Sequence, residues 1–528
     1  MAKIVLINPS YLHTYGANHA GIANPVYPIL SLAALAGVGK ARGHTVRILD
    51  LSYRAYDPVF LKNYIREEKP DVVGITATTP LVNQMRDMSF LIKEVSKDIL
   101  TVGGGSHPSS LPQETMMESL LDVVAVGEAD DTFGELIDGH ALKSIRGIYW
   151  RNGGEIVANP LRPLIPYLDA LPMPAWELYP LDEYRKRVGN LIAKYWPLTT
   201  LEFSRGCVFQ CDFCGSKNTM GLGYRKKSPE RCADEMAYLE KIGFREALLT
   251  DDIFTSDNHW AVEVCTAITK RKLKMAWTCT NGIRVDSANE ELFRAMKTAG
   301  CYRVHFGFES GNDAVLKAFG KGGHASLKEG QRAVRTARAA GLETWGMFMV
   351  GLSADTEATM NDTIGFAKAV DVDVKKLGIT VPFPGTPMFR DLLRVGKIKT
   401  LNWDDYNVYN EATQIYDHPT LSWKVIKSYY RKAYLDIYYK SPTYIAHRLL
   451  RGIRTGEFFW DLYFAVKFFL LLISRPTVQE KENYAYRDRW EKLNISRENV
   501  GNYTHQKATT STWKANDPVA AGSQSASA

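Results

Sequence analysis

The chain has 528 residues, 45% of them hydrophobic and 23% charged, and its 65 basic and 58 acidic residues leave a formal net charge of only +7. This length predicts about two to four domains, because single hydrophobic cores rarely grow beyond about 250 to 300 residues. So small a positive excess argues against a nucleic-acid partner. Seven cysteines, none of them before Cys207, do not form the pattern of a secreted disulfide framework and favour a reducing cytoplasm.

Residues 1–140 alternate β-rich runs with helical stretches, which predicts a doubly wound parallel sheet of the Rossmann-like α/β class. The first apolar run is too short for a signal peptide and is predicted as a strand. We expect strands at residues 3–7, 45–49, 72–76, 101–102 and 123–126, and a helix near residues 28–41.

Two loops of this segment are rich in Gly, Ser and Thr, and each follows a predicted strand. Such sheets bind ligands beyond the carboxyl ends of their strands, where glycines allow close backbone approach and hydroxyls supply hydrogen bonds. Simple turn chemistry is the alternative. The candidate ligand contacts are Thr76, Thr78, Gly103, Gly104 and Gly105.

Residues 141–196 are predicted to form a bridge without chemistry of its own. Asn152 and Gly153 lie between apolar runs, which is a strong signal for a hairpin turn. A stretch with five prolines follows, and prolines cannot extend a helix. They are Pro160, Pro163, Pro166, Pro172 and Pro174.

The most informative stretch is residues 204–215, where Cys207, Cys211 and Cys214 stand within eight residues. Three thiols on one loop indicate a metal site. Zinc would need Cys232 or a His such as His259 as a fourth ligand, yet structural zinc sites usually come as two spaced pairs. Unliganded buried cysteines are the other alternative. Iron–sulfur clusters are normally held by four thiolates, so three would leave one iron open.

The spacing Cys-x3-Cys-x-Phe-Cys, with Phe213 before the last cysteine and Gly215 after it, resembles the signature loop of the radical SAM enzymes. The resemblance implies a [4Fe–4S] cluster on the three cysteines and S-adenosylmethionine (SAM) at the open iron. The sheet of residues 1–137 ahead of this loop is similar to the cobalamin-binding domain of the cobalamin-dependent subfamily, which implies cobalamin as a third cofactor.

One motif departs from part of that subfamily. Domains whose His ligates cobalt carry Asp-x-His-x-x-Gly, whereas here Tyr11 replaces the Asp ahead of His13 and Gly16. A ligand His normally has an acceptor for its second ring nitrogen. We therefore expect His13 to be a loop residue, and many members of the subfamily bind cobalamin without such a ligand.

Residues 197–395 return to alternating strands and helices, and the six βα units predict a partial (β/α)6 barrel of the radical SAM type. Barrel sites lie at the carboxyl ends of strands. The strands are expected at residues 199–203, 247–249, 277–280, 304–308, 344–350 and 376–381.

Four acidic or hydroxyl residues at these strand ends are candidate SAM contacts. The resemblance implies that Glu309 or Ser310 meets the methionyl or ribose part of SAM, and that residues 351–357 and 381–387 line it. Asp251 and Asp252 are either ligands or N-caps of the next helix. Cys279, Cys301 and His305 lie in or beside strands, where core packing is more common than substrate contact.

Residues 396–499 are aromatic and basic and are predicted to form a helical region. Its run 458–473 has sixteen residues interrupted by Asp461 and Lys467, whereas a membrane-spanning helix needs about 20 apolar residues. It therefore suits either packing as a lid on the barrel or a helix in a membrane interface, peripheral to the inner face of the membrane. Residues 500–528 are rich in Ser, Thr, Ala and Gly and are predicted to be disordered.

The resemblance implies reductive cleavage of SAM to a 5′-deoxyadenosyl radical, with electrons from a flavodoxin- or ferredoxin-type reductant, and hydrogen abstraction from an unactivated carbon. We expect methyl transfer from methylcobalamin to a large apolar substrate, such as a lipid, polyketide or tetrapyrrole. Oxidative ring closure, as in the anaerobic magnesium-protoporphyrin monomethyl ester cyclases, is the runner-up. A methylthiotransferase would need a second cluster on earlier cysteines, and a cobalamin sensor would need no cysteine loop.

Overall fold

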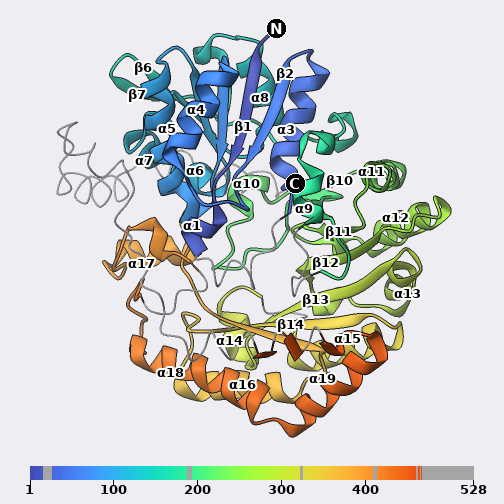
Figure 1. Ribbon diagram of the computed structural model, residues 1–528. Helices are drawn as coiled ribbons and strands as arrows, with labels where there is room; N and C mark the ends of the chain where they lie inside the picture. The colour runs from blue at the N-terminus through green and yellow to red at the C-terminus, as the bar shows by residue number, and fades with distance from the viewer. Residues whose placement is uncertain are drawn as a thin grey trace, which may run out of the picture.

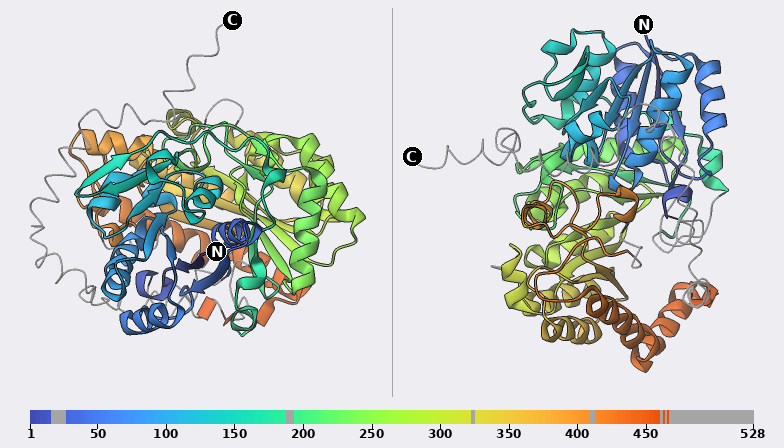
Figure 2. Two further views of the ribbon diagram at one scale, coloured as in Figure 1. Left: turned by 90° about the horizontal axis from the view of Figure 1, so that it is seen from above. Right: turned by 90° about the vertical axis from the view of Figure 1, so that its left-hand side faces the viewer.

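The computed structural model describes residues 1–15, 27–186, 193–321, 325–407, 413–459, 462–463 and 465–466. Two β-sheets organise this part of the chain, one near each end of the view in Figure 1. The first carries the amino-terminal residues and the second forms an open barrel. The carboxyl-terminal helices lie at the far end of the barrel from the first sheet, as Figure 1 and the right-hand view of Figure 2 show.

The first sheet has seven strands in the order β2-β1-β3-β4-β5-β6-β7. Its parallel part confirms the predicted doubly wound fold, and the strand order reverses between β1 and β3, where such folds bind ligands. The parallel strands are β1 (Lys3–Asn8), β2 (Thr45–Asp50), β3 (Val72–Thr76), β4 (Leu100–Gly104) and β5 (Val123–Ala125).

Helices cover both faces of this sheet because successive residues of its strands are apolar and point alternately to opposite sides. Ile4 and Leu6 pack in one core with α3 (Leu30–Ala41) and α8 (Asp130–Ile137). Val5 and Ile7 pack in another core with three helices of the opposite face. These are α4 (Pro58–Glu68), α5 (Val82–Val95) and α7 (Pro112–Met117).

The predicted hairpin is present as β6 (Ile148–Asn152) and β7 (Glu155–Ala158), and β6 pairs antiparallel with β5. Residues 148–158 therefore extend the first sheet. The prolines that follow run along the junction of the two sheets, where the backbone N–H of Ala175 donates to the Ala33 carbonyl at 2.8 Å.

The second sheet has six parallel strands in chain order, β8 at one edge and β15 at the other, which confirms the predicted partial barrel. Helices α11 (Pro229–Ile242), α12 (Asn258–Lys270), α13 (Glu290–Thr298), α15 (Leu327–Ala339) and α16 (Glu357–Ala369) cover its outer face. The strands are β8 (Leu198–Leu201), β11 (Glu246–Leu249), β12 (Ala276–Ile283), β13 (Cys301–Glu309), β14 (Glu343–Val350) and β15 (Val374–Ile379).

After α17 (Pro387–Arg394) the chain crosses to the first sheet and returns. Trp403, on the turn η7 (Trp403–Asp405), and Tyr406, directly after it, are buried in the core of β1, α4 and α5. The chain then re-enters the barrel, where the Tyr416 hydroxyl donates to the Gly351 carbonyl at 2.8 Å. Residues 396–407 and 413–416 thus tie the two sheets together.

The last helices cover the β15 edge of the barrel. They are α18 (Trp423–Tyr434), the π-helical turn η8 (Leu435–Tyr439) and α19 (Pro442–Thr455). The hydroxyl of Tyr434 donates to the Leu377 carbonyl at 3.0 Å, and that of Tyr438 donates to the Lys375 carbonyl. In the described chain no helix combines the length and the apolar character that crossing a bilayer requires.

Candidate cluster and cofactor site

The cysteine loop leaves the barrel after β9 (Ser204–Arg205) and ends at the short helix α10 (Lys217–Met220). Cys207, Cys211 and Cys214 are half-buried and form no disulfide. The loop starts with Gly206 at φ +84°, where a Cβ atom would lie 2.1 Å from the Gly223 carbonyl oxygen. Only glycine fits there, because both the conformation and the space exclude a side chain.

Neighbouring elements hold the middle of the loop from two sides. The backbone N–H of Asp212 donates to the Phe319 carbonyl at 3.1 Å, and the N–H of Met388 donates to the Asp212 carbonyl at 3.0 Å. The rings of Phe213 and Phe319 meet edge to face at 5.4 Å. Phe319 follows α14 (Asp313–Ala318), so Phe213 anchors the loop between α14 and the start of α17.

The chemistry of the thiols fits a bound cluster. Burial raises the pKa of Cys211 to about 11 and also raises that of Cys207, so a cation is needed to hold these sulfurs as thiolates. A cubane cluster supplies such a cation at each thiol, because each thiolate binds a different iron.

Asp251 and Asp252 hold the strand that leads into the loop. Asp251 accepts from the Phe203 N–H at 2.8 Å and from the Ser204 hydroxyl at 2.5 Å, and Asp252 accepts from the Gly206 N–H at 3.1 Å. Burial raises their pKa values to about 7 and about 6. The cap alternative is wrong for both, since the caps of the next two helical segments are Ile253 and Asp257.

Glu309 ends β13 in a left-handed conformation with φ +62°, which is costly for a residue with a side chain. Its carboxylate pairs with the Lys321 ammonium at 2.9 Å. A Cβ atom on Gly307 would lie 2.4 Å from the same carboxylate, so a side chain at this position would displace the pair. Strain at a strand end of the barrel is typical of a ligand site.

The structure gives Ser310 a different setting from Glu309. Ser310 is fully buried, and its hydroxyl lies 3.3 Å from that of Thr363 on α16 and accepts from the Asn312 N–H at 3.2 Å. These contacts join the end of β13 to a covering helix. Gly215 lies beside Thr386, at the start of α17, with 3.8 Å from its would-be Cβ to the Thr386 methyl group.

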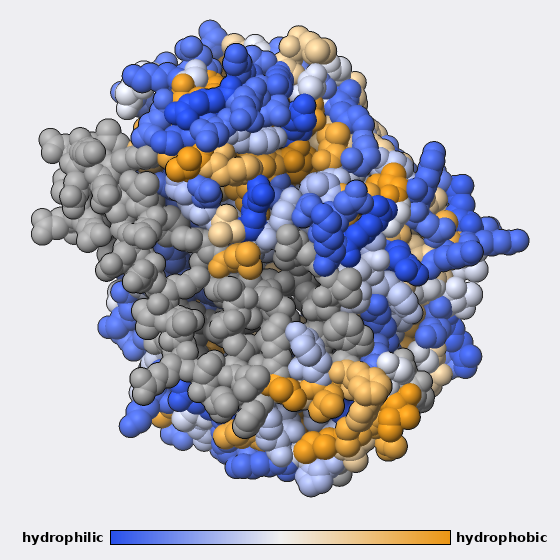
Figure 3. All heavy atoms as spheres, viewed as in Figure 1, coloured by the Kyte–Doolittle hydropathy of each residue, from blue (hydrophilic) through white to orange (hydrophobic). Residues whose placement is uncertain are grey.

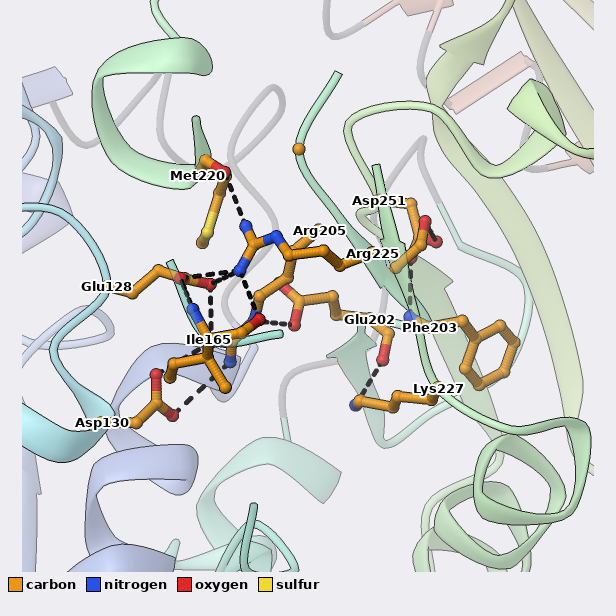
Figure 4. A network of polar contacts seen from close by, with 12 residues as sticks. Glu128, Asp130, Ile165, Glu202, Phe203, Arg205, Met220, Arg225, Lys227 and Asp251 are labelled. Atoms are coloured by element: carbon orange, nitrogen blue, oxygen red, sulfur yellow. Dashed lines mark hydrogen bonds and ion pairs between the residues drawn. The ribbon is translucent and has the colours of Figure 1, made fainter. Parts of the chain in front are cut away.

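A buried ionic network connects the barrel with the first sheet directly before the cysteine loop (Figure 4). Arg205 contacts Asp130 at 2.8 Å, Glu128 at 3.1 Å and Glu202 at 2.7 Å. Arg225 contacts Glu128 at 2.7 Å and donates to the Met220 carbonyl of α10 at 2.6 Å. Every side chain in these ion pairs is at most 10% exposed. Sequence reasoning missed this network, because Glu128 and Asp130 lie 77 and 75 residues before Arg205 in the chain, although Glu202 lies three residues before it.

The predicted cobalamin loops lie together at the carboxyl ends of β3 and β4. The Ala77 N–H donates to the Gly104 carbonyl at 2.9 Å. A Cβ atom on Gly103 would lie 2.6 Å from the Leu121 side chain, and one on Gly105, at φ +104°, would lie 2.6 Å from the Ala77 carbonyl oxygen. Gly104 instead has no neighbour within 4 Å of a Cβ atom.

The exposed part of this edge fits a bound cofactor. Thr78 and Gly105 are exposed, and Thr76 and Gly104 are half-exposed. The open space beside Gly104 and the exposed hydroxyls give a polar edge that a large ligand can approach. Gly103 instead allows the Leu121 side chain to pack closely against the strand. His13 belongs to α1 (Tyr11–Tyr15), but its side chain and Gly16 lie outside the described residues.

The two candidate sites adjoin each other. Helix α10, at the end of the cysteine loop, packs on α6 (Ser106–Ser110), which begins directly after Gly105. A Cβ atom on Gly385 would lie 2.2 Å from the amide of Asn218 in α10 and 2.7 Å from the hydroxyl of Ser110 in α6. The turn after β15 therefore closes on both loops.

The remaining candidates of the barrel are core residues. Cys279 and Cys301 are buried in the main apolar core with Cys265. His305 is 4% exposed and stacks on Trp345 with ring centres 4.7 Å apart, and burial lowers its pKa to about 3. In the turn of residues 351–357, predicted to line SAM, Asp355 accepts from the Leu352 N–H at 2.9 Å.

Comparison with known proteins agrees with this geometry. Residues 201–367 match the radical SAM superfamily and residues 22–137 match the B12 binding domain. The chain belongs to the cobalamin-binding radical SAM enzymes, whose cofactors are a [4Fe–4S] cluster, SAM and cobalamin.

Similar proteins carry names that imply different activities. The chain is 33% identical to the uncharacterized methyltransferase PH0819 of Pyrococcus horikoshii, over 81% of this chain and 93% of that protein. It is 28% identical to the anaerobic magnesium-protoporphyrin IX monomethyl ester cyclase of Rubrivivax gelatinosus, over 77% of this chain and 72% of that protein. The fold matches OxsB with aqua-cobalamin and SAM bound, at TM-score 0.66 and 16% identity, over 96% of this chain and 79% of that one.

Proposed function

We propose that the protein is a C-methyltransferase that transfers a methyl group from cobalamin to an unactivated carbon of a large apolar substrate. Residues 1–140 form the cobalamin-binding domain, residues 197–395 the radical SAM core and residues 396–499 the covering region. When bound, the cluster and SAM supply a radical that abstracts hydrogen, and cobalamin supplies the methyl group.

The chain's own residues hold and separate these groups. Cys207, Cys211 and Cys214 bind the cluster, and Glu309 binds a positive or hydroxyl-bearing part of SAM, for which a carboxylate is a strong acceptor. Asp251 and Asp252 act as positioning residues because they fix the backbone that enters the loop. Thr76, Thr78, Gly104 and Gly105 line the cobalamin edge, with Gly103 supporting it.

One observation carries the proposal: α10, which ends the cysteine loop, packs directly on α6, which begins directly after the glycine loop of residues 103–105. A radical formed at the first loop would therefore arise beside the methyl donor. The turn after β15 covers both loops and would help to exclude water from them.

The test is turnover of anaerobically reconstituted enzyme with methyl-labelled SAM, a flavodoxin-type reductant and apolar candidate substrates. Label in the product supports methyl transfer. The Rubrivivax relative supports a second candidate, oxidative ring closure, which predicts an unlabelled product with one additional ring. A Cys211→Ala enzyme should give neither product, and a product that it still forms would contradict the cluster assignment.

A further inference from the structure

Most of the exposed large hydrophobic side chains of the described chain lie in one segment, residues 435–466. Scattered single exposed apolar residues are ordinary, but a contiguous group marks an interaction surface. Its members are Leu435, Tyr439, Ile445, Leu449, Leu450, Ile453, Phe459, Leu462, Tyr463 and Val466, each at least 40% exposed.

Helix α19 presents its apolar residues away from the protein. Tyr444 packs on Tyr438 with ring centres 5.1 Å apart, and Arg451, 4% exposed, contacts Glu343 of β14. The opposite side carries Ile445, Leu449 and Ile453, spaced by four residues, with exposed fractions of 43%, 47% and 68%. A surface helix normally has the reverse arrangement, with its polar side outward.

The surroundings of this face are strongly basic. Between Trp423 and Val466 there are eight Lys and Arg residues, and the acidic residues are Asp436, Glu457 and Asp461. Of the basic residues there, Lys424, Arg431, Lys432 and Lys440 are exposed. The basic residues of this span are Lys424, Lys427, Arg431, Lys432, Lys440, Arg448, Arg451 and Arg454.

The face lies at the end of the molecule opposite the first sheet. Hydrophobic side chains gather at the lower right of Figure 3, where Figure 1 places α19, at the far end of the barrel from the first sheet. The apolar run 458–473 follows α19 in the sequence. In this run Phe459, Leu462 and Val466 expose 79%, 52% and 51% of their surface, whereas Phe458 is half-buried, so these three side chains do not pack on the barrel.

We propose that the face formed by α19 together with Phe459, Leu462, Tyr463 and Val466 docks on a bilayer of anionic phospholipid. The apolar stripe enters the interfacial region and the exposed lysines and arginines meet the lipid phosphates, as in amphipathic helices that lie on membranes. The basic surroundings favour this partner over a second copy of the chain, which would bring two basic faces together. The proposal is independent of the methyl-transfer reaction.

Vesicle flotation of the full-length protein tests the surface. The wild type should float with phosphatidylcholine vesicles that contain phosphatidylglycerol, and much less with phosphatidylcholine alone. The triple variant Ile445→Ser/Leu449→Ser/Ile453→Ser should reduce the bound fraction by at least about tenfold, because each replacement removes apolar burial. Its matched control is Val59→Ser/Tyr167→Ser/Val395→Ser, three exposed apolar positions elsewhere that should float like the wild type.

A charge variant, Lys424→Gln/Lys432→Gln/Lys440→Gln, separates the electrostatic contribution to membrane binding from the apolar one. It should weaken binding to anionic vesicles and leave the small binding to neutral vesicles unchanged. Equal flotation of the wild type and the serine variant would overturn the proposal, as would no flotation at all. Reversible dimerisation of the wild type without flotation, lost in the serine variant, would assign the face to a second copy instead.

Discussion

The guanidinium of Arg205 lies 2.8 Å from the carboxylate of Asp130. This ion pair joins the strand that enters the cysteine loop to the first turn of α8, a helix that packs on the first sheet. Glu128 and Glu202 complete the contacts of the same arginine. Because all four side chains are at most 10% exposed, the arrangement depends on charge balance within the protein.

Replacing Arg205 by Met should destabilise the protein by about 3 to 5 kcal/mol, because buried carboxylates lose their main counter-ion. Chemical denaturation would measure the loss. Arg294→Met is the matched control, since Arg294 is 66% exposed and pairs only with Glu290 within α13; its cost should stay below about 1 kcal/mol. Equal costs for both variants would contradict a special role for the network.

The cysteine assignment predicts selective loss of iron. Ala at Cys207, Cys211 or Cys214 should abolish the cluster's visible absorbance and its iron and sulfide content after anaerobic reconstitution. Cys232→Ala should retain both, because Cys232 is fully buried in α11. Full iron content in the Cys211 variant would be incompatible with the assignment.

Glu309→Gln should weaken SAM binding by roughly ten- to a hundredfold, as expected for a charge-assisted hydrogen bond. Equilibrium dialysis against the reconstituted protein measures this. Glu309→Gly should also lose SAM affinity; glycine relieves the strain at φ +62°, but the loss of the carboxylate that pairs with the Lys321 ammonium offsets that gain in stability. SAM binding at wild-type strength in both variants would exclude Glu309 from the site.

The glycine loop gives a test that separates ligand space from packing. Gly104→Ala should leave the thermal midpoint unchanged, since its Cβ would meet nothing within 4 Å, but should lower cobalamin affinity by filling the space that the ligand uses. Gly154→Ala, equally open but in the hairpin turn, should change neither. Cobalamin titration by absorbance measures the difference, and unchanged affinity in the Gly104 variant would place the cofactor elsewhere.

Asp251 predicts a pH dependence of stability. Its pKa in the folded protein is about 7, compared with an ordinary 3.8. Between these values the folded state binds the proton more strongly, so stability falls as pH rises from about 4 to 7 and levels off above that. The neutral Asp251→Asn variant should show a flatter profile of thermal midpoint against pH. Parallel profiles would mean that Asp251 is ionised throughout.

Local patterns were sufficient to predict the strands, the barrel and the cysteine loop. Short apolar runs mark buried parallel strands, and the boundaries of β13 and β14 differ from the predicted ones by only a few residues. Gly103, Gly104 and Gly105 stood out together in the sequence, but their separate environments did not. Those environments depend on Leu121 and Ala77, which the fold brings to them.

Contacts between distant segments could not be predicted in this way. Glu128 lies 77 residues before Arg205, and no pattern in the sequence around Glu128 identifies Arg205 as its partner. Trp403 lies 289 residues after Glu114, to which its indole N–H donates at 2.7 Å. The outward apolar face of α19 is a further case, because its helical periodicity alone cannot tell which side meets the barrel.

The tyrosines of α18 and η8 bond directly to the carbonyls of β15, the last strand of a sheet that never closes into a full barrel. During synthesis this strand is complete before the residues that cover it exist, so a nascent chain passes through a stage with a bare strand edge open to pairing with other chains. Fragments that stop near residue 395 would remain at that stage. Any preparation of the radical-generating core therefore needs the chain at least through α18, and folding of the core in the cell must wait for it.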